Sequence, residues 1–240
     1  MARKSIAGLA LTGLALMFGA PSPVLGEVPK PDAVPAAPKA PALRTAAPPG
    51  YCAFNPKAEE NSGLQTGFRP GVEGSTELVA MFVPCAELDR AKAGHTSWVP
   101  DWVALETNTV TLPADDDRIA GTRGAVEMLC KDAQYAHSKI DAPTFEAKAE
   151  MAHKGLSAEH PVIYFGVIGE EQGVCYLSSL RLETDSLGAP HRLLSVVGFM
   201  TSGDRWVHLS AHRETPDAST AGDVFALVQR SAQEFMRDNP

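Results

Sequence analysis

The chain has 240 residues, is 44% hydrophobic and carries a formal net charge of −8. This length and apolar content suffice for one domain of ordinary size with a packed core. The acidic balance argues against binding to nucleic acid and to anionic lipid surfaces, because both attract clustered positive charge.

The N-terminus has the pattern of a secretory signal peptide. Arg3 and Lys4 form a positive region, Ile6–Met17 is apolar, and small or tolerated residues precede a cut near Gly26. We expect residues 1–26 to be removed; the alternative is an uncleaved anchor, for which the apolar run is short. Removal takes two of 21 basic residues and none of the 29 acidic ones, so the net charge falls from −8 to −10. The mature protein is therefore expected in the periplasm or outside the cell.

A linker is predicted after the signal. Residues 27–50 are mostly Pro, Ala, Val and Lys, without aromatic residues or periodicity, which is typical of a semi-extended polyproline segment. Residues 51–240 are predicted to form a single domain.

Four cysteines lie beyond the signal: Cys52, Cys85, Cys130 and Cys175. An even number in an oxidising compartment predicts two disulfides, for which three pairings exist. We favour Cys52 with Cys85 and Cys130 with Cys175, each worth about 3–4 kcal/mol in the chain-entropy model. A zinc site is the alternative, but no two cysteines have the close spacing typical of zinc ligands.

Helical periodicity and apolar runs in the first half of the domain predict mixed helices and strands. In chain order these are a weak helix at 56–71, a strand at 77–83, a helix at 85–93, a strand within 97–111, and helices at 118–137 and 143–156. Trp98 and Trp102 are interpreted as core or rim packing. The acids at 115–117 precede a helix, whose dipole favours negative charge there; a calcium loop is the weaker alternative because its closing glutamate is missing.

The second half predicts a four-strand antiparallel meander closed by a helix. The strands are expected at 161–168, 174–182, 193–200 and 205–213, separated by turns at 169–173, 185–190 and 201–204. Glu170 and Glu171 are expected at a solvated turn tip. The final helix begins after Thr220 as N-cap, with Asp223 at capping-box-like spacing, and packs its apolar stripe on the last hairpin.

The last strand carries the candidate binding residues. Its side chains alternate, so one face takes Val207, Leu209 and Ala211 and the other takes Trp206, His208, Ser210 and His212. His208 and His212 are roughly 13 Å apart at about 3.3 Å per residue, too far to share one metal ion. We interpret both histidines as solvent-facing, and Trp206, His208 and His212 as a candidate shallow binding surface.

Motifs of catalytic chemistry are not found in the sequence. It has no Gly-x-Ser-x-Gly elbow, His-Glu-x-x-His motif, phosphate-binding loop or dinucleotide fingerprint. Ser178 and Ser179 lack a nearby base, although members of a triad can be distant in sequence. No metal or other cofactor is expected. We therefore expect a non-enzymatic periplasmic accessory or binding module of the cell envelope, with an envelope protein as partner; the alternative is a periplasmic hydrolase or metal-dependent enzyme with scattered active-site residues.

Two stretches resemble a known family. Gly50-Tyr51-Cys52 and the segment 78–88, which ends in Cys-Ala-Glu-Leu, resemble uncharacterised secreted proteobacterial proteins with a Tyr-Cys start and a strand ending in Cys-x-Glu-Leu. The strand order with its C-terminal helix is similar to the PsbP/Mog1-like αβα sandwich. Over about Gly50–Pro240 this resemblance implies an α+β fold with an antiparallel sheet and covering helices. It also supports pairing Cys52 with Cys85, and it implies no activity. The glycine-broken segment 63–74 departs from the usual PsbP-like start.

Overall fold

The computed structural model describes residues 42–66, 76–108, 124, 126–131, 142–203, 205–215 and 220–240. The predicted signal peptide, most of the linker and the acidic residues 115–117 lie outside these ranges. None of the described helices is long and apolar enough to cross a membrane.

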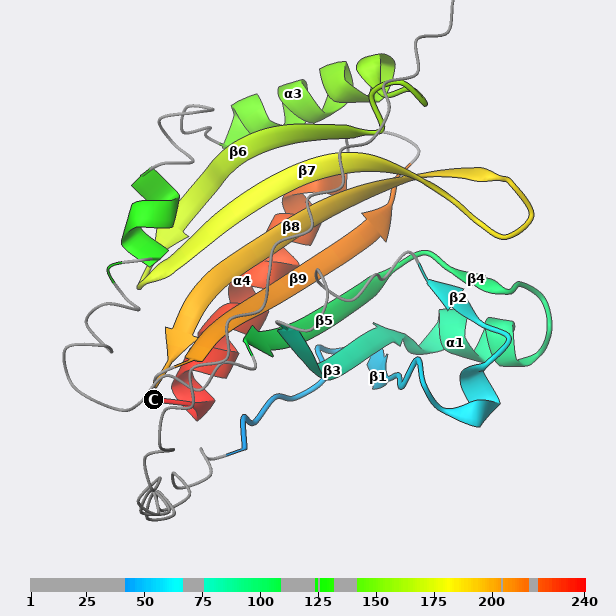
Figure 1. The fold of residues 1–240 in the computed structure, drawn as a ribbon, viewed down its shortest axis with the longest axis horizontal. Coiled ribbons are helices and arrows are strands. Elements are labelled where there is room, and N and C mark those ends of the chain that lie inside the picture. The colour runs from blue at the N-terminus through cyan, green and yellow to red at the C-terminus, as the bar shows by residue number, and fades with distance from the viewer. Residues whose placement is uncertain are drawn as a thin grey trace, which may run out of the picture. The chain divides into compact units, whose positions relative to one another are not determined.

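A seven-stranded antiparallel sheet organises the described residues, in the order β1-β3-β5-β9-β8-β7-β6 (Figure 1). Its strands are β1 (Tyr51–Ala53), β3 (Thr76–Pro84), β5 (Trp102–Asn108), β6 (Val162–Glu171), β7 (Val174–Thr184), β8 (Pro190–Ser202) and β9 (Arg205–Glu214). A second, parallel pair joins β2 (Gln65–Thr66) to β4 (Trp98–Val99). The helices are η1 (Glu59–Asn61), α1 (Cys85–Lys92), α3 (Ala142–Gly155) and α4 (Ala221–Asp238).

The predicted meander is confirmed, because β6, β7, β8 and β9 are consecutive neighbours in the sheet. A connection that was not predicted joins it to the first half of the domain. Strand β5 pairs with β9, which places Trp102 opposite His212 and Leu105 opposite Leu209. The first strands therefore extend the meander into one sheet.

One face of the sheet is covered by α3 and α4, which Figure 1 shows along β6 and behind β8 and β9. The stripe predicted for the last helix is buried here, with Val224, Val228 and Phe235 against the sheet. Gly198 of β8 allows the close packing, because a Cβ atom there would lie 3.2 Å from side-chain atoms of Tyr176 and Val174. Small residues in the strands thus let large ones from the helix and the neighbouring strand fill the core.

The other face, which we call the second face, is covered only in parts by described residues. At one end α1 and β4 bury a cluster that includes Met81, Val83, Leu88 and Trp102. At the β6–β7 end, the helical residues 126–131 contribute Val126 and Cys130, which pack with Val167 and Cys175. The middle of the second face carries the candidate functional residues.

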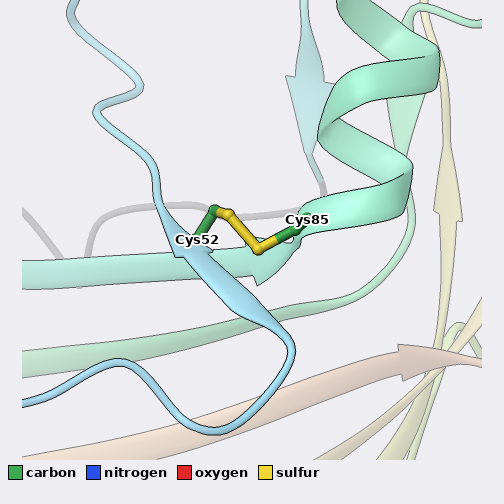
Figure 2. Close-up of a disulfide and its surroundings, with 2 residues drawn as sticks. All are labelled: Cys52 and Cys85. Carbon is green, nitrogen blue, oxygen red and sulfur yellow. A yellow bond between two sulfur atoms is a disulfide. The ribbon is translucent and has the colours of Figure 1, made fainter.

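Both favoured disulfides are present. Cys52 of β1 is bonded to Cys85 at the start of α1 (Figure 2), and Cys130 is bonded to Cys175 of β7. All four cysteines of the sequence are therefore bonded. The first bond fastens β1 to the junction of β3 and α1; the second fastens the helical residues 126–131 to the sheet.

Three local predictions are wrong. Within 56–66 the only helix is the short 3-10 helix η1, and residues 65–66 form the strand β2. Glu170 and Glu171 belong to β6, because the turn is the two residues Gln172-Gly173, whose positive φ values of 49° and 81° suit a tight hairpin. Glu171 accepts a hydrogen bond of 2.6 Å from Gln229 of α4, so it is not at a solvated tip.

The two ends of the described chain meet on the domain. Arg44, near the end of the predicted linker, donates its backbone N–H to Asn239 Oδ1 at 2.8 Å, and Asn239 Nδ2 donates back to the Arg44 carbonyl at 2.7 Å. Leu43 packs against the core.

At the other end of α4, Thr220 makes no side-chain cap; its hydroxyl donates to Thr215 Oγ1 at 3.3 Å. The predicted capping box is therefore not formed.

Candidate functional site

The three candidate binding residues lie on β9 and share the second face, as the alternation of that strand predicts. Val207, Leu209 and Ala211 point into the core beneath α3 and α4. The structure divides the candidate residues between two environments. Trp206 packs against the cluster of residues 126–131 and His208 contacts Phe199, which packs there too, whereas His212 lies beside Trp102 of β5.

Trp206 and His208 belong to an aromatic patch, which we define as Leu177, Phe199, Trp206 and His208. All four side chains are partly exposed. Phe199 lies opposite His208 in the β8–β9 ladder, and their rings meet edge to face with centroids 4.7 Å apart. Leu177, Phe199 and Trp206 pack against the cluster that contains the Cys130–Cys175 disulfide. The patch thus adjoins a cluster that a disulfide fastens to the sheet.

The aromatic patch is uncharged at neutral pH. Burial lowers the pKa of His208 below its usual value, so its ring is neutral. Glu106, whose side chain is a carboxylate, lies opposite His208 in the β5–β9 ladder. The surface therefore combines aromatic and aliphatic area and has one acid at its border. Aromatic side chains are enriched where proteins bind other proteins, whereas glutamate is depleted there.

A cavity of about 410 Å³ adjoins the strand ends near this patch. It lies where the β6–β7 and β8–β9 turns approach the end of α4, and its lining includes Glu127, Glu170, Thr201 and Met236. Cys175, which also lines it, lies opposite Phe199 in the β7–β8 ladder. The patch and the cavity therefore share one end of the sheet.

His212 has a different environment: its side chain is only partly exposed, so the expectation that it faces solvent holds only in part. Trp102, which is fully buried, stacks on its ring with centroids 4.6 Å apart and planes 14° apart. Ser195 Oγ lies 2.7 Å from His212 Nδ1, and Arg181 Nη2 lies 3.3 Å from the same nitrogen. The cause is the β5–β9 pairing, which places Trp102 over the outer face of β9.

These contacts fix the protonation state of His212. Burial, and then the positive charge of Arg181, lower its pKa well below the usual value of 6.5. The guanidinium can only donate, so Nδ1 acts as the acceptor and the ring proton is assigned to Nε2. A neutral imidazole beside a cation is a weak base, and Ser195 is 3% exposed. The pair is better suited to link β8 and β9 than to activate a nucleophile.

A second histidine, His191 of β8, was not singled out in the sequence. Its Nδ1 lies 2.8 Å from Glu214 Oε1 and its Nε2 lies 3.4 Å from Asp185 Oδ2. Trp98 stacks on the ring with centroids 4.4 Å apart. Burial lowers the pKa of His191, but the hydrogen bonds to Glu214 and Asp185 outweigh it and raise the pKa above 6.5. No local sequence motif indicates these contacts of His191, because its partners come from a turn and from another strand.

We refer to the polar end of the second face as the histidine network. It consists of Trp98, Trp102, Arg181, Asp185, His191, Ser195, His212 and Glu214. Asp101 borders it, accepting hydrogen bonds from Arg213 Nε at 3.0 Å and from the backbone N–H of Glu214 at 3.1 Å. Each network histidine is thus held by a tryptophan on its face and by polar partners at its edge.

Neither group brings metal-ligating side chains together in the part of the chain that the structure describes. Among the described ranges, no three His, Cys, Asp or Glu side chains lie close enough to hold a metal ion together. His208 and His212 occupy separate environments, so they do not form a shared site with Trp206. Within this part of the chain, the aromatic patch contains two of the three candidate binding residues.

Comparisons with known proteins give a likeness of fold. No family model matches the chain, and no curated protein matches it. Among solved structures, the Saccharomyces cerevisiae Ran-binding protein Mog1p aligns with 13% identity and a TM-score of 0.36, covering 82% of this chain and 88% of Mog1p. The predicted α+β class, an antiparallel sheet with covering helices, is confirmed by the described elements. The likeness to Mog1p says nothing about what this protein binds.

Proposed function

We propose that the protein is a non-enzymatic periplasmic accessory or binding module of the cell envelope, and that it holds a protein partner on its aromatic patch. The observation that supports this most is the arrangement of Phe199 and His208, which stack edge to face while both stay partly exposed beside Trp206. Aromatic side chains with one packed and one accessible side dominate the binding energy of many protein interfaces.

Location in the periplasm rests on two kinds of support. The bonds Cys52–Cys85 and Cys130–Cys175 fit an oxidising compartment outside the cytoplasm. The sequence pattern of residues 1–26 predicts a secretory signal peptide, which agrees with this location. These residues lie outside the described ranges, so the signal peptide stays a prediction. The membership of a family of secreted proteobacterial proteins likewise stays a prediction.

Binding is favoured over catalysis because the best acid and base groups already serve other contacts. His212 is stacked and accepts from a serine and an arginine, and His191 bridges two carboxylates. A general base needs a free lone pair within reach of a substrate proton. The aromatic patch, by contrast, offers accessible apolar surface.

The test is site-specific photo-crosslinking in the native cell envelope. A photoreactive amino acid replaces His208 in the aromatic patch or, as the control, Met151 of α3, which is 72% exposed on a helix that packs against the other face. We expect one dominant protein adduct from position 208 that purified unlabelled protein competes away, and none from 151. Equal labelling from both positions, or no competed adduct, would contradict the proposal.

The alternative function, a periplasmic hydrolase, rests on one observation, the 2.7 Å contact between Ser195 Oγ and His212 Nδ1. It predicts turnover of activated esters by the purified protein that disappears in Ser195→Ala. Our proposal predicts the same background rate for both proteins. An ester-hydrolysis assay of the wild type and the variant, with folding checked by circular dichroism, separates the two functions.

A further inference from the structure

A cavity of about 500 Å³ lies at the opposite end of the sheet from β6, along the outer edge of β3. Its walls are the residues that follow β1, the 3-10 helix η1, the strand β3 and the end of α1. The lining includes Phe54, Asn61, Leu78, Ala80, Met81 and Lys92. It shares no residue with the aromatic patch, so this cavity is a separate candidate site.

The edge of β3 is only partly paired along this cavity. β1 pairs with residues 82–84, and the backbone N–H of Phe54 donates to the Met81 carbonyl at 2.8 Å. On the same side, no strand within the described ranges pairs with residues 76–80, although β5 pairs with them on the other side. An open stretch of this kind can accept a further strand.

Asn61 presents an unpaired buried acceptor beside this cavity. Its side chain is 5% exposed and lines the cavity, and its Nδ2 donates to the Asn55 carbonyl at 2.9 Å. Its Oδ1 is buried and accepts no hydrogen bond from the described part of the chain. Leaving a buried acceptor unpaired costs about 1–3 kcal/mol. The cavity therefore calls for an N–H donor.

We propose that this cavity binds an extended peptide segment that continues the line of β1 along β3 and donates one backbone N–H to Asn61 Oδ1. A peptide supplies regularly spaced N–H groups, and the apolar walls at Phe54 and Met81 would bury its side chains. Glu60 and Lys92 contribute one charge of each sign to the lining, so a strongly charged ligand gains no advantage. This goes beyond the proposed function, because the site lies apart from the aromatic patch.

The bound segment must be short. The β3–β5 ladder has an irregularity between Leu78 and Ala80, and such bulges interrupt regular pairing on the strand that carries them. β1 already occupies residues 82–84. The Met81 carbonyl already accepts from Phe54. Only a few residues of ligand backbone can therefore pair next to residues 76–80, and side-chain burial must supply the remaining affinity.

The test begins with a phage-displayed library of random linear peptides, selected on the oxidised wild-type protein. Selected peptides are synthesised, and hydrogen exchange is measured on the protein with and without peptide. We expect slower exchange of backbone amides in residues 76–81. Absence of any selected peptide, or protection only in β6–β9, would overturn the proposal.

A scan of the peptide distinguishes strand pairing from binding through side chains alone. Replacing its backbone N–H groups one at a time by N-methyl should weaken binding at alternate residues, because only every second N–H of a strand faces β3. A flat scan would contradict strand addition. This measurement does not depend on any protein variant folding correctly.

Variants of the protein then locate the acceptor. Asn61→Leu removes Oδ1 and should weaken peptide binding by roughly tenfold, the equivalent of about 1.4 kcal/mol. Trp206→Ala in the aromatic patch should leave peptide affinity unchanged, and it reports separately on the proposed function. Full affinity in a folded Asn61→Leu, or loss of peptide binding in Trp206→Ala, would count against this site.

Discussion

Ser195 and His212 face each other across the β8–β9 ladder, with Ser195 Oγ 2.7 Å from His212 Nδ1. A serine at this distance from a histidine would ordinarily suggest a catalytic pair. The surroundings indicate otherwise, because Trp102 covers the ring and the Arg181 guanidinium lies 3.3 Å from the same nitrogen. These contacts keep the imidazole of His212 neutral. We therefore expect its protonation to change the stability of the fold rather than a catalytic rate.

The first prediction concerns acid sensitivity. Because the pKa of His212 is lowered in the folded protein, its stabilising contribution is present above about pH 6.5 and is lost as pH falls below that value. His212→Asn keeps an acceptor near Ser195 but cannot be protonated in this range. Between pH 7.5 and 5.5 the free energy of unfolding, measured by urea denaturation, should fall more for the wild type than for His212→Asn. Equal falls would show that the pKa of His212 is not lowered in the folded protein.

The second prediction has the opposite sign. The pKa of His191 is raised by Glu214 and Asp185, so its contribution is present below pH 6.5 and is lost as pH rises through the higher folded pKa. His191→Gln should therefore lower the free energy of unfolding more at pH 5.5 than at pH 8.5. Asp185→Asn, which leaves the ring in place, should reduce the same difference. A pH-independent loss in both variants would mean that packing on Trp98 alone matters.

The sequence predicts those parts of the fold that depend on residues close together in the chain. The strands β6 to β9 follow one another through short turns, so alternation and turn residues were enough to predict the meander and its closing helix. The pairing of β5 with β9 joins residues about a hundred positions apart, and periodicity carries no signal for such a pair. The turn predicted at 169–173 is too long, because the glycine at 169 suggests an earlier end of the strand than the Gln172-Gly173 turn that forms.

The same limit explains the site. Alternation along β9 placed Trp206, His208 and His212 on one face, which is where they lie. It could not show that Trp102 covers only His212, since that depends on the β5–β9 pairing. His191 was missed because the residues that define it, Asp185 and Glu214, are ordinary surface types in the sequence. Their roles arise only from tertiary contacts.

A third prediction tests the close packing of the sheet. In Gly198→Ala the new Cβ would lie 3.2 Å from side-chain atoms of both Tyr176 and Val174, which are buried and cannot move away freely. We expect a loss of about 1–3 kcal/mol in the free energy of unfolding, as for other overpacked cores. Gly63→Ala is the matched control, because nothing lies within 4 Å of its added methyl. Similar losses in both variants would contradict the packing described.

A fourth prediction concerns the hydroxyl of Tyr176. It is buried without a hydrogen-bond partner among the described residues, and burial, with a smaller effect of Glu171, raises its pKa to about 12. Tyr176→Phe removes an unpaired polar group and keeps the edge-to-face contact with Phe225. Thermal and urea unfolding should show unchanged stability or a gain of up to about 1 kcal/mol. A clear loss would reveal a partner, such as a bound water, for this hydroxyl.

The two disulfides offer a fifth prediction that separates stability from binding. They close loops of similar length, with cysteines 33 and 45 positions apart, so the chain-entropy model gives each about 3–4 kcal/mol. Replacing both cysteines of either pair by serine should therefore lower the free energy of unfolding by comparable amounts. Of the two, the Cys130–Cys175 bond belongs to the cluster against which Phe199 and Trp206 of the aromatic patch pack.

The double variants should therefore differ in partner capture. At a temperature where both remain folded, crosslinking from position 208 should fall when the Cys130–Cys175 bond is removed and stay near wild type when the Cys52–Cys85 bond is removed. The reason is that the former fastens the helical residues 126–131, which adjoin the patch, to β7, whereas the latter holds β1 to α1. Equal capture by the two variants would show that the patch needs no covalent support from its neighbouring cluster, and that its shape is set by the sheet alone.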